Sequence, residues 1–545
     1  MAAPTSKTSP FDALERAVID HLFVLQPGYA VGLGLHEYDG RLPDFSVAAT
    51  DRWTRGADEL LSRLSEVPEE SLPSSRKSDR FLLTLLLESP LFDIRSVSDL
   101  ERNPMNYLGS VSLTQYLIRD YAPAAQRVEA IARTLEQVPR LLQDGRDRLR
   151  GPLPKPFVDL SLAIGSGLPA HLDEAQEFAD RAHLSEEVRA VRVPAVAAIT
   201  EFLHWLREYQ LPKAVPEFAL GPTLYQQLLF VREGIEAPFE EIRRAGTADL
   251  ARNQRRLDEI ARASQRTVPE LLDEMNQTHP TAEELIPTAR SFVEETRRFV
   301  SDHGLVTVPE EARCRVDETP VWGRALSTAS MNPPGPFDST SSEGVYYVTP
   351  VDAKWTATQQ DEWLRSLNRS ILRNTTVHEV YPGHYLQFLH FRRTPGSLAR
   401  KVYLSPSFVE GWAHYAEQLA VENGVGHDDR LAEVAQLHDA LLRNTRLLVS
   451  IGLHTGGMTL EEATRLFQTE AHMERLPAER EAIRGTFNPE YFCYTLGKLA
   501  ILNARHRLLA TKFGGSLRSF HDTLLALGCP PVGLLDSLLE SAPAA

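Results

Sequence analysis

Two short segments carry the residues best suited to chemistry. The first is residues 378–384, HEVYPGH, and the second is residues 410–417, EGWAHYAE. Together they offer two imidazoles, a carboxylate directly after the first imidazole, and further Glu and His residues downstream. Two His and one Glu can bind a zinc ion, and another Glu can activate a water molecule for hydrolysis. The residue types therefore predict a hydrolytic zinc site.

The spacing of the two His differs from the usual H-E-x-x-H, in which they lie one helical turn apart. His384 follows His378 by six positions, which at about 100° per residue places it roughly 120° away around a continuous helix. Pro382 and Gly383 offer an explanation, because proline interrupts a helix and glycine tolerates unusual backbone angles. We expect a bulge or break that returns His384 to the face of His378. The alternative is a helix that ends at Tyr381, with the two His as polar neighbours at its boundary.

The second segment places its ionisable residues on one face of a helix. Glu410, His414 and Glu417 recur at positions i, i+4 and i+7, which is one helical stripe. Such groups are costly to bury without partners or a metal. The alternative is a solvated face that carries an i,i+4 Glu–His pair. The intervening Trp412 and Tyr415 disfavour a widely wetted surface.

Helical periodicity dominates the elements that must position these segments. The only clear strand material falls between residues 312 and 349, and the chain is helical again from residue 359. We expect a mainly α architecture, with an N-terminal helical lobe (1–308) and a catalytic lobe (309–545) that carries a small β-sheet beside the metal-binding helices. The lobes are expected to form one continuous body around a central cleft, with a soft boundary. The strongest helical stretches are residues 11–25, 79–88, 124–149, 186–209, 238–263 and 282–300.

The best strand in the second half is residues 344–350, GVYYVTP, which is aromatic and β-branched and is bounded by Gly and Pro. Two interpretations stay open. It is either an edge strand to which a peptide substrate could add a further strand, or an internal structural strand.

Composition excludes some classes of function. The net charge of −16 over 545 residues leaves no basic stripe for nucleic acid. The three cysteines are far apart and form no CxxC, which is typical of reduced thiols in a cytoplasmic protein. The first residues lack an apolar segment, and no run of about twenty apolar residues occurs. We therefore expect a soluble cytoplasmic protein that binds neither nucleic acid nor membrane; the oligomeric state is not predicted.

The two motifs resemble those of a bacterial family catalogued as domain of unknown function 885, whose members resemble gluzincin-type zinc metallopeptidases. Residues 378–384 fit the family's H-E-x-x-P-G-H, and residues 410–417 fit its E-G-W-x-x-Y-x-E. Residues 34–44, 494–498 and 520–522 add weaker similarity, so the resemblance runs almost end to end. It implies a large helical, peptidase-like fold.

The resemblance also implies roles for individual residues. His378 and His384 would bind one zinc ion per chain, Glu410 would be the third ligand, and Glu379 would be the general base. His414, one turn after Glu410, would support the ligands or replace Glu410 among them.

Glu417 could accept the free N–H of a ligating His and so fix the orientation of the ring. A phenol or imidazole could help to hold the oxyanion of the reaction. Tyr494 is the first candidate, Tyr415 the second and His521 the third. Plain core packing is the alternative for Tyr494, because aromatic residues cluster around it.

We therefore expect a zinc-dependent metallopeptidase in which Glu379 activates water at the metal. The alternatives are a metal-dependent hydrolase of a non-peptide amide or ester, and a non-catalytic metal-binding protein. The expected partner is a peptide or a small amide substrate, and another divalent ion could replace zinc. A carboxypeptidase would also need a cation for the terminal carboxylate, for which Arg484 and Lys498 are candidates.

Overall fold

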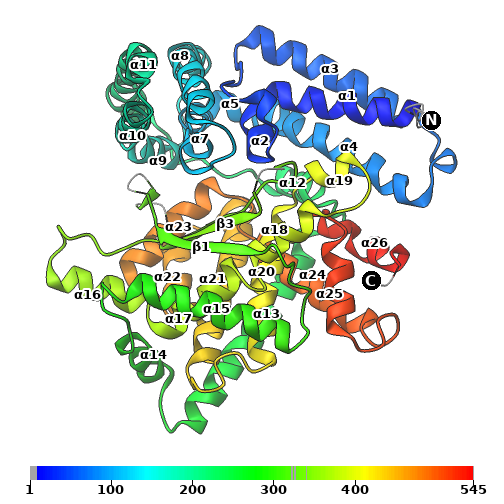
Figure 1. Cartoon of the computed structure of the whole chain (residues 1–545), viewed down its shortest axis with the longest axis vertical. Coiled ribbons are helices and arrows are strands. Elements are labelled where there is room, and N and C mark those ends of the chain that lie inside the picture. Colours follow the sequence, from blue (N-terminus) through cyan, green and yellow to red (C-terminus); the bar gives the residue numbers. More distant parts are fainter. Residues whose placement is uncertain (1–8, 321–322, 325–326, 339–340, 544–545) are drawn as a thin grey trace. The chain divides into compact units, whose positions relative to one another are not determined.

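Long amphipathic helices form most of the chain, as the computed structural model shows (Figure 1). The structure describes residues 9–320, 323–324, 327–338 and 341–543. The chain divides into two units. Unit 1 comprises Met1–Phe218, Phe337–Thr340 and Gly396–Tyr403, and unit 2 comprises Ala219–Pro336, Ser341–Pro395 and Leu404–Ala545. No helix among the described residues is both long and apolar enough to cross a membrane.

Unit 1 is a set of helices around its own apolar core. The two long helices α8 and α11 pack against each other, and α10 packs on α11. The helices of unit 1 are α1 (Pro10–Leu25), α2 (Pro27–Gly32), α3 (Val47–Ser65), α4 (Ser74–Leu91), α5 (Asp99–Arg102), α6 (Met105–Leu108), α7 (Thr114–Ile118), α8 (Ala124–Arg148), α9 (Lys155–Gly165), α10 (Leu168–Arg181), α11 (Ser185–Trp205) and α19 (Leu398–Val402).

Unit 2 holds both motifs and the small sheet. Its helices before and around the first motif are α12 (Pro222–Glu233), α13 (Phe239–Ala263), α14 (Val268–Gln277), α15 (Leu285–Asp302), α16 (Ala357–Ser366), α17 (Arg369–Glu379) and α18 (His384–Arg392). Those that follow are α20 (Pro406–Glu422), α21 (Ala432–Thr455), α22 (Leu460–Glu470), α23 (Arg475–Phe487), α24 (Cys493–Leu508), α25 (Leu517–Leu525) and α26 (Leu535–Ser541).

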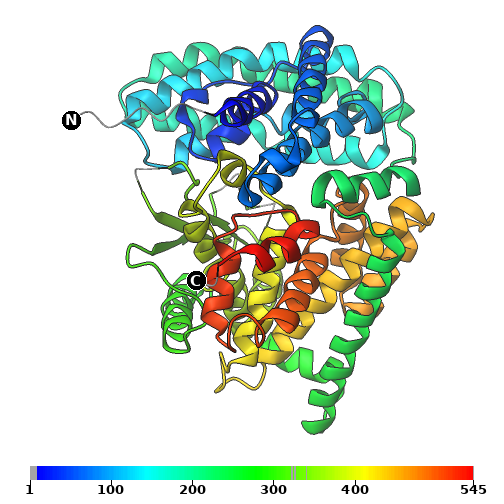
Figure 2. The same ribbon diagram turned by 90° about the vertical axis from the view of Figure 1, so that its right-hand side faces the viewer.

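The helices of unit 2 pack side by side around the second motif. Helix α13 packs on α21, and α20 packs on both α24 and α17 (Figures 1 and 2). The contact between α20 and α24 depends on two glycines. A Cβ atom added to Gly411 would lie 2.3 Å from the Cα of Gly497, and one added to Gly497 would lie 1.7 Å from the carbonyl oxygen of Ser407. Only glycine therefore permits this close approach.

The sheet has three strands in the order β1–β3–β2, namely β1 (Arg313–Glu318), β3 (Glu343–Val348) and β2 (Ala329–Asn332). Strand β3 pairs with β1 in parallel and with β2 in antiparallel orientation. Helix α15 packs against β1, whereas α17 and α18 contact β2. Of the two interpretations of residues 344–350, the internal strand is therefore correct, because β3 has a neighbour on each side.

The predicted mainly α fold with a small sheet beside the motif-bearing helices is confirmed, and the strongest helical stretches form helices. The boundary differs from the expected one at residue 308, because the two units divide after Phe218. Helices α12 to α15 belong to unit 2, where α13 covers α21 and α15 covers α17 and β1. Helical periodicity identifies an apolar face, but it does not indicate which core that face joins.

Candidate metal centre

The helix that carries His378 ends where the Pro-Gly pair predicts a break. Helix α17 ends at Glu379 and α18 begins at His384. Gly383 lies so close to the preceding turn that a Cβ atom there would be 1.8 Å from the carbonyl oxygen of His378. Trp412 holds the connection from α20, since its Nε1–H donates a hydrogen bond of 2.9 Å to the carbonyl oxygen of Pro382. The break therefore brings His384 back beside His378, with ring centroids 4.7 Å apart.

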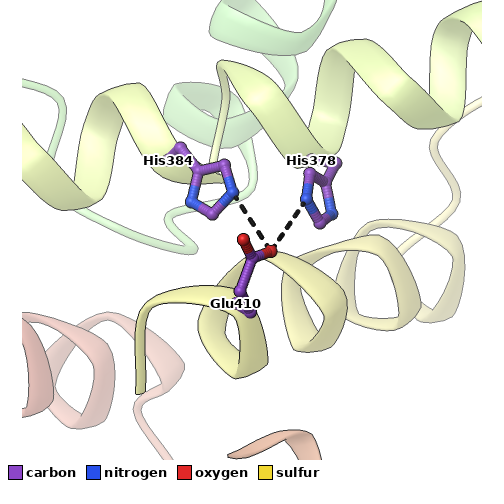
Figure 3. A group of neighbouring side chains, drawn as sticks. All are labelled: His378, His384 and Glu410. Atoms are coloured by element: carbon purple, nitrogen blue, oxygen red, sulfur yellow. Dashed lines mark ion pairs between the residues drawn. The ribbon is translucent and has the colours of Figure 1, made fainter. Parts of the chain in front are cut away.

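Helix α20 presents Glu410 to both imidazoles. It begins after Ser405, whose hydroxyl accepts a hydrogen bond of 2.9 Å from the N–H of Phe408. Glu410 lies one turn into the helix, and its Oε2 is 3.6 Å from the Nε2 of His378 and 3.6 Å from the Nε2 of His384 (Figure 3). Among the described residues these three form a candidate metal site, with one ligand atom from each and all three atoms within 4.8 Å of one another.

The three side chains fit a zinc ion by distance and by type. A separation of 3.6 Å is too long for a hydrogen bond. Tetrahedral zinc with bonds of about 2.0–2.2 Å holds its ligand atoms roughly 3.3–3.5 Å apart, close to the Nε2–Oε2 distances in this cluster. Two imidazoles and one carboxylate also leave a fourth position open, as in catalytic rather than structural zinc sites.

Glu417 supports His378 from the side opposite Glu410. Its Oε1 is 2.6 Å from the Nδ1 of His378. An Nδ1–H that donates to this carboxylate leaves the Nε2 lone pair free to face Glu410, which is the tautomer that a metal ligand requires. Glu417 is fully buried. Burial alone would raise its pKa, but the Arg443 charge and the two His hydrogen bonds hold the pKa well below its usual range.

Three residues around Glu417 were missed by the sequence reasoning. Arg443 on α21 lies 3.0 Å from Glu417 Oε1 and reaches 3.4 Å from the Nδ1 of His378. Asn374 on α17 donates to Glu417 Oε2 at 3.3 Å and to Asp439 at 2.7 Å. Asn374 lies one turn before His378, so its position in the sequence could have indicated that it lies near the site. Arg443 and Asp439 come from a distant helix, and their local sequence gives no such indication.

His414 lies beside the cluster but does not join it. Its Nδ1 is 3.4 Å from Glu417 Oε2, and its Nε2 is buried without a hydrogen-bond partner among the described residues. Burial, followed by the Lys498 charge, lowers the pKa of His414 to about 4. Of the two residues left open as third ligand, Glu410 rather than His414 therefore faces the two imidazoles.

The ionisable side chains of the cluster shift one another's pKa values. Burial by itself would lower the pKa of His378, but the carboxylates of Glu410 and Glu417 outweigh it and raise that pKa to about 10. The pKa of Glu410 is lowered by the same two imidazoles, against the opposing effect of burial. Without an ion, positive charge is thus stabilised at this point of unit 2, which suits a cation site.

Glu379 lies beside the cluster without belonging to it. The last residue of α17 is half-buried, and its side chain has no hydrogen bond or ion pair with any residue in the described ranges. It faces the sheet. Burial raises the pKa of Cys314 on β1 to about 12, and the charges of Glu343 and Glu379 add to this effect. Glu379 is therefore a carboxylate without a partner among the described residues, directly after the candidate ligand His378.

The two tyrosine candidates have different surroundings. The charge of Glu410 contributes, after burial, to a raised pKa of Tyr494, and the Tyr494 hydroxyl has no partner within the described part of the chain. Tyr415 is fully buried, and its hydroxyl is bonded to His521 at 2.8 Å and to Arg505 at 3.2 Å. His521 in turn bonds the carbonyl oxygen of Leu305 at 2.7 Å. The side chains of Tyr415 and His521 therefore form hydrogen bonds within the core, whereas the Tyr494 hydroxyl has none to a described residue.

A family model decides the membership of the chain. The model described as "Bacterial protein of unknown function (DUF885)" matches residues 27–539, which include both motifs. The chain belongs to the DUF885 family. No curated protein matches it.

Solved structures give the same fold. A candidate lipoprotein of unknown function from Shewanella oneidensis is 24% identical, with a TM-score of 0.80 over 98% of this chain and 100% of its own. A candidate lipoprotein from Colwellia psychrerythraea is 18% identical, with a TM-score of 0.79 over 98% and 99%. An M32 carboxypeptidase from Deinococcus radiodurans R1 matches at 14% identity with a TM-score of 0.30, which is too low to carry an argument.

The expected cytoplasmic location is contradicted by these comparisons and is withdrawn, because the Shewanella and Colwellia proteins are described as candidate lipoproteins. The state of the three cysteines does not depend on an oxidising or reducing compartment. Cys493 and Cys529 are buried, Cys314 is half-buried, and all three are free. Burial raises the pKa of each thiol, which keeps the reactive thiolate form scarce, so free thiols at these positions do not indicate a compartment.

Proposed function

We propose that this chain is a metal-dependent hydrolase, and that it is a zinc metallopeptidase in which Glu379 activates the attacking water. The observation that carries the proposal is the convergence of His378, His384 and Glu410 beside the partner-free Glu379. A site that only stabilised the fold would need no free carboxylate next to an open position.

In this mechanism each residue has a distinct task. His378 and His384 offer Nε2 and Glu410 offers Oε2 to the ion, and Glu417 fixes the ring of His378 through the 2.6 Å contact at Nδ1. The zinc ion would lower the pKa of a water molecule and polarise the carbonyl of the substrate. Glu379 would take the proton of that water and return it to the departing amine.

Tyr494 would donate its hydroxyl proton as a hydrogen bond to the oxyanion that forms on the substrate. Support comes from its unpaired hydroxyl and its electrostatic coupling to Glu410. Such a donor acts in proportion to the charge that develops, so it lowers the barrier more than it strengthens substrate binding.

The test is the Glu379→Gln variant, purified in parallel with wild type and supplied with zinc. The amide keeps the volume of the carboxylate but cannot accept the proton. We expect a full complement of zinc and a loss of peptide cleavage by a factor of about 10³ or more. Cleavage at the wild-type rate by zinc-loaded Glu379→Gln would refute the mechanism. Turnover of small amides or esters without any peptide cleavage would instead favour the non-peptide hydrolase.

A further inference from the structure

A row of alternating aromatic rings and guanidinium groups leads away from the candidate metal centre. The Cζ of Arg443 lies 5.8 Å from the ring centroid of Tyr494, and the Cζ of Arg446 lies 5.3 Å from the same ring. Arg446 also lies 5.1 Å from the ring of Tyr491, and the Cζ of Arg484 lies 5.3 Å from that ring. Three arginines therefore gather around two tyrosines at one side of the site.

Two of the three arginines are neutralised within unit 2. Arg443 pairs with Glu417 at 3.0 Å, and Arg446 forms two hydrogen bonds of 2.8 Å to Glu481. Arg484 on α23 differs from both. It is half-buried, and its side chain has no hydrogen bond or ion pair to any described residue. The charge of Arg484 acts at a distance on Glu481, which is already paired with Arg446, and no carboxylate among the described residues forms a direct ion pair with Arg484.

The charge of Arg484 acts on the same phenol as the candidate ligand Glu410. Burial and then Glu410 raise the pKa of Tyr494, whereas the charges of Arg446 and Arg484 lower it. Tyr494 therefore lies within electrostatic reach of both groups. Lys498, the other candidate cation from the sequence, cannot serve a substrate, because it is fully buried and lies 2.7 Å from Asp249.

We propose that Arg484 binds a carboxylate of the substrate, and that this carboxylate is the free C-terminus of a peptide cleaved near that end. The inference rests on the proposed function, which it sharpens from peptides in general to peptides with an anionic terminus. A guanidinium group is a planar fork that meets a carboxylate with two parallel hydrogen bonds. Its place beyond Tyr494 would orient the substrate so that the scissile carbonyl faces the metal and the phenol.

The experiment compares two matched peptide libraries, one with free C-termini and one with C-terminal amides, each with and without acidic side chains. Zinc-loaded wild type, Arg484→Gln and Arg465→Gln are assayed on both. Arg465 is exposed on the neighbouring helix α22 and serves as the control. We expect wild type to cleave free acids at least tenfold better in kcat/KM than amides. Arg484→Gln should lose this preference through KM, and Arg465→Gln should keep it.

Binding supplies a readout that needs no turnover. The same peptides, with a fluorescent N-terminus, are titrated onto zinc-loaded Glu379→Gln with and without Arg484→Gln. A tenfold weaker Kd for amides that disappears with Arg484→Gln supports the inference. An unchanged preference after Arg484→Gln overturns it, and so does a preference that follows acidic side chains instead of the terminus. Terminus-dependent binding without cleavage by wild type would sustain the role of Arg484 while refuting the peptidase.

Discussion

His378 and Glu417 are joined by the shortest contact of the candidate metal centre, 2.6 Å between Nδ1 and Oε1. This contact joins α17 to α20 inside the core of unit 2, and both side chains are buried. It has two consequences. It selects the tautomer of His378 whose Nε2 faces Glu410, and it gives the buried Glu417 one of its hydrogen bonds. Metal binding at this site would therefore be coupled to the packing of the two helices.

Glu417→Gln should weaken metal binding without abolishing it. The amide cannot fix the His378 ring in the same way, and loss of such a partner typically costs 10- to 100-fold in metal affinity. A competitive chelator titration gives the dissociation constant. Glu422→Gln, five residues later on the same helix and paired with Arg505 near the surface, is the control. An unchanged metal affinity in Glu417→Gln would contradict the assigned role.

Gly383→Ala tests the break between the two His. The added Cβ would meet the carbonyl oxygen of His378 at 1.8 Å, and a backbone atom cannot move aside without shifting a candidate ligand. We expect at least a tenfold loss of metal affinity and a lower Tm. Gly151→Ala is the matched control, because nothing lies within 4 Å of the position that its Cβ would occupy. Normal metal binding by Gly383→Ala would show that the geometry of this connection does not matter.

Tyr494→Phe should affect catalysis, whereas Tyr415→Phe should affect stability. Removal of the Tyr494 hydroxyl should lower kcat by about 10²-fold and leave the Tm unchanged, since that hydroxyl has no partner among the described residues. Removal of the Tyr415 hydroxyl leaves His521 Nε2 unpaired in the core, which should cost about 1–3 kcal/mol in the free energy of unfolding. Steady-state kinetics and urea unfolding of both variants decide this, and reversed effects would refute the assignment.

Glu233 should make the stability of unit 2 depend on pH. It is fully buried, and burial raises its pKa to about 7 despite hydrogen bonds from Ser405, Ser407 and the N–H of Val532. Because the unfolded-state pKa is lower, about 4.3, the native state holds an extra proton between these values. Its contribution to stability is therefore present at low pH and is lost as the pH rises toward 7.

The measurement is urea unfolding of wild type and Glu233→Gln at pH 5 and pH 8. Between pH 5 and pH 8, the free energy of unfolding of the variant should rise relative to that of wild type by on the order of 3 kcal/mol, since each pKa unit corresponds to about 1.4 kcal/mol. Glu283→Gln, an exposed carboxylate on unit 2, is the control. A difference between variant and wild type that does not change with pH would contradict the raised pKa.

The sequence predicted the local features of the site well, because they depend on residues close together in the chain. Pro382 and Gly383 indicated the break between α17 and α18, and the helical spacing of Glu410 and Glu417 placed both on one face. Features that depend on distant packing were not predictable. Arg443 reaches Glu417 from α21, and nothing in its local sequence distinguishes it from a surface arginine.

The same limit explains the differences in the fold. The apolar face of α13 packs on α21 rather than within the N-terminal helices, a choice made by surfaces that periodicity does not identify. The strand at residues 343–348 had the right composition for an edge or for an interior position, and only its neighbours decide between them. Tyr415 looked as suitable as Tyr494 until its bond to His521 was visible.

The most direct test of the central claim is the metal content of purified protein supplied with zinc. Wild type is compared with His378→Ala, Glu410→Ala and the control His506→Ala, which removes an exposed imidazole on α24. We predict about one zinc per chain in wild type and in the control, and its loss in the other two variants. No zinc in wild type, or full zinc in both His378→Ala and Glu410→Ala, would contradict the account.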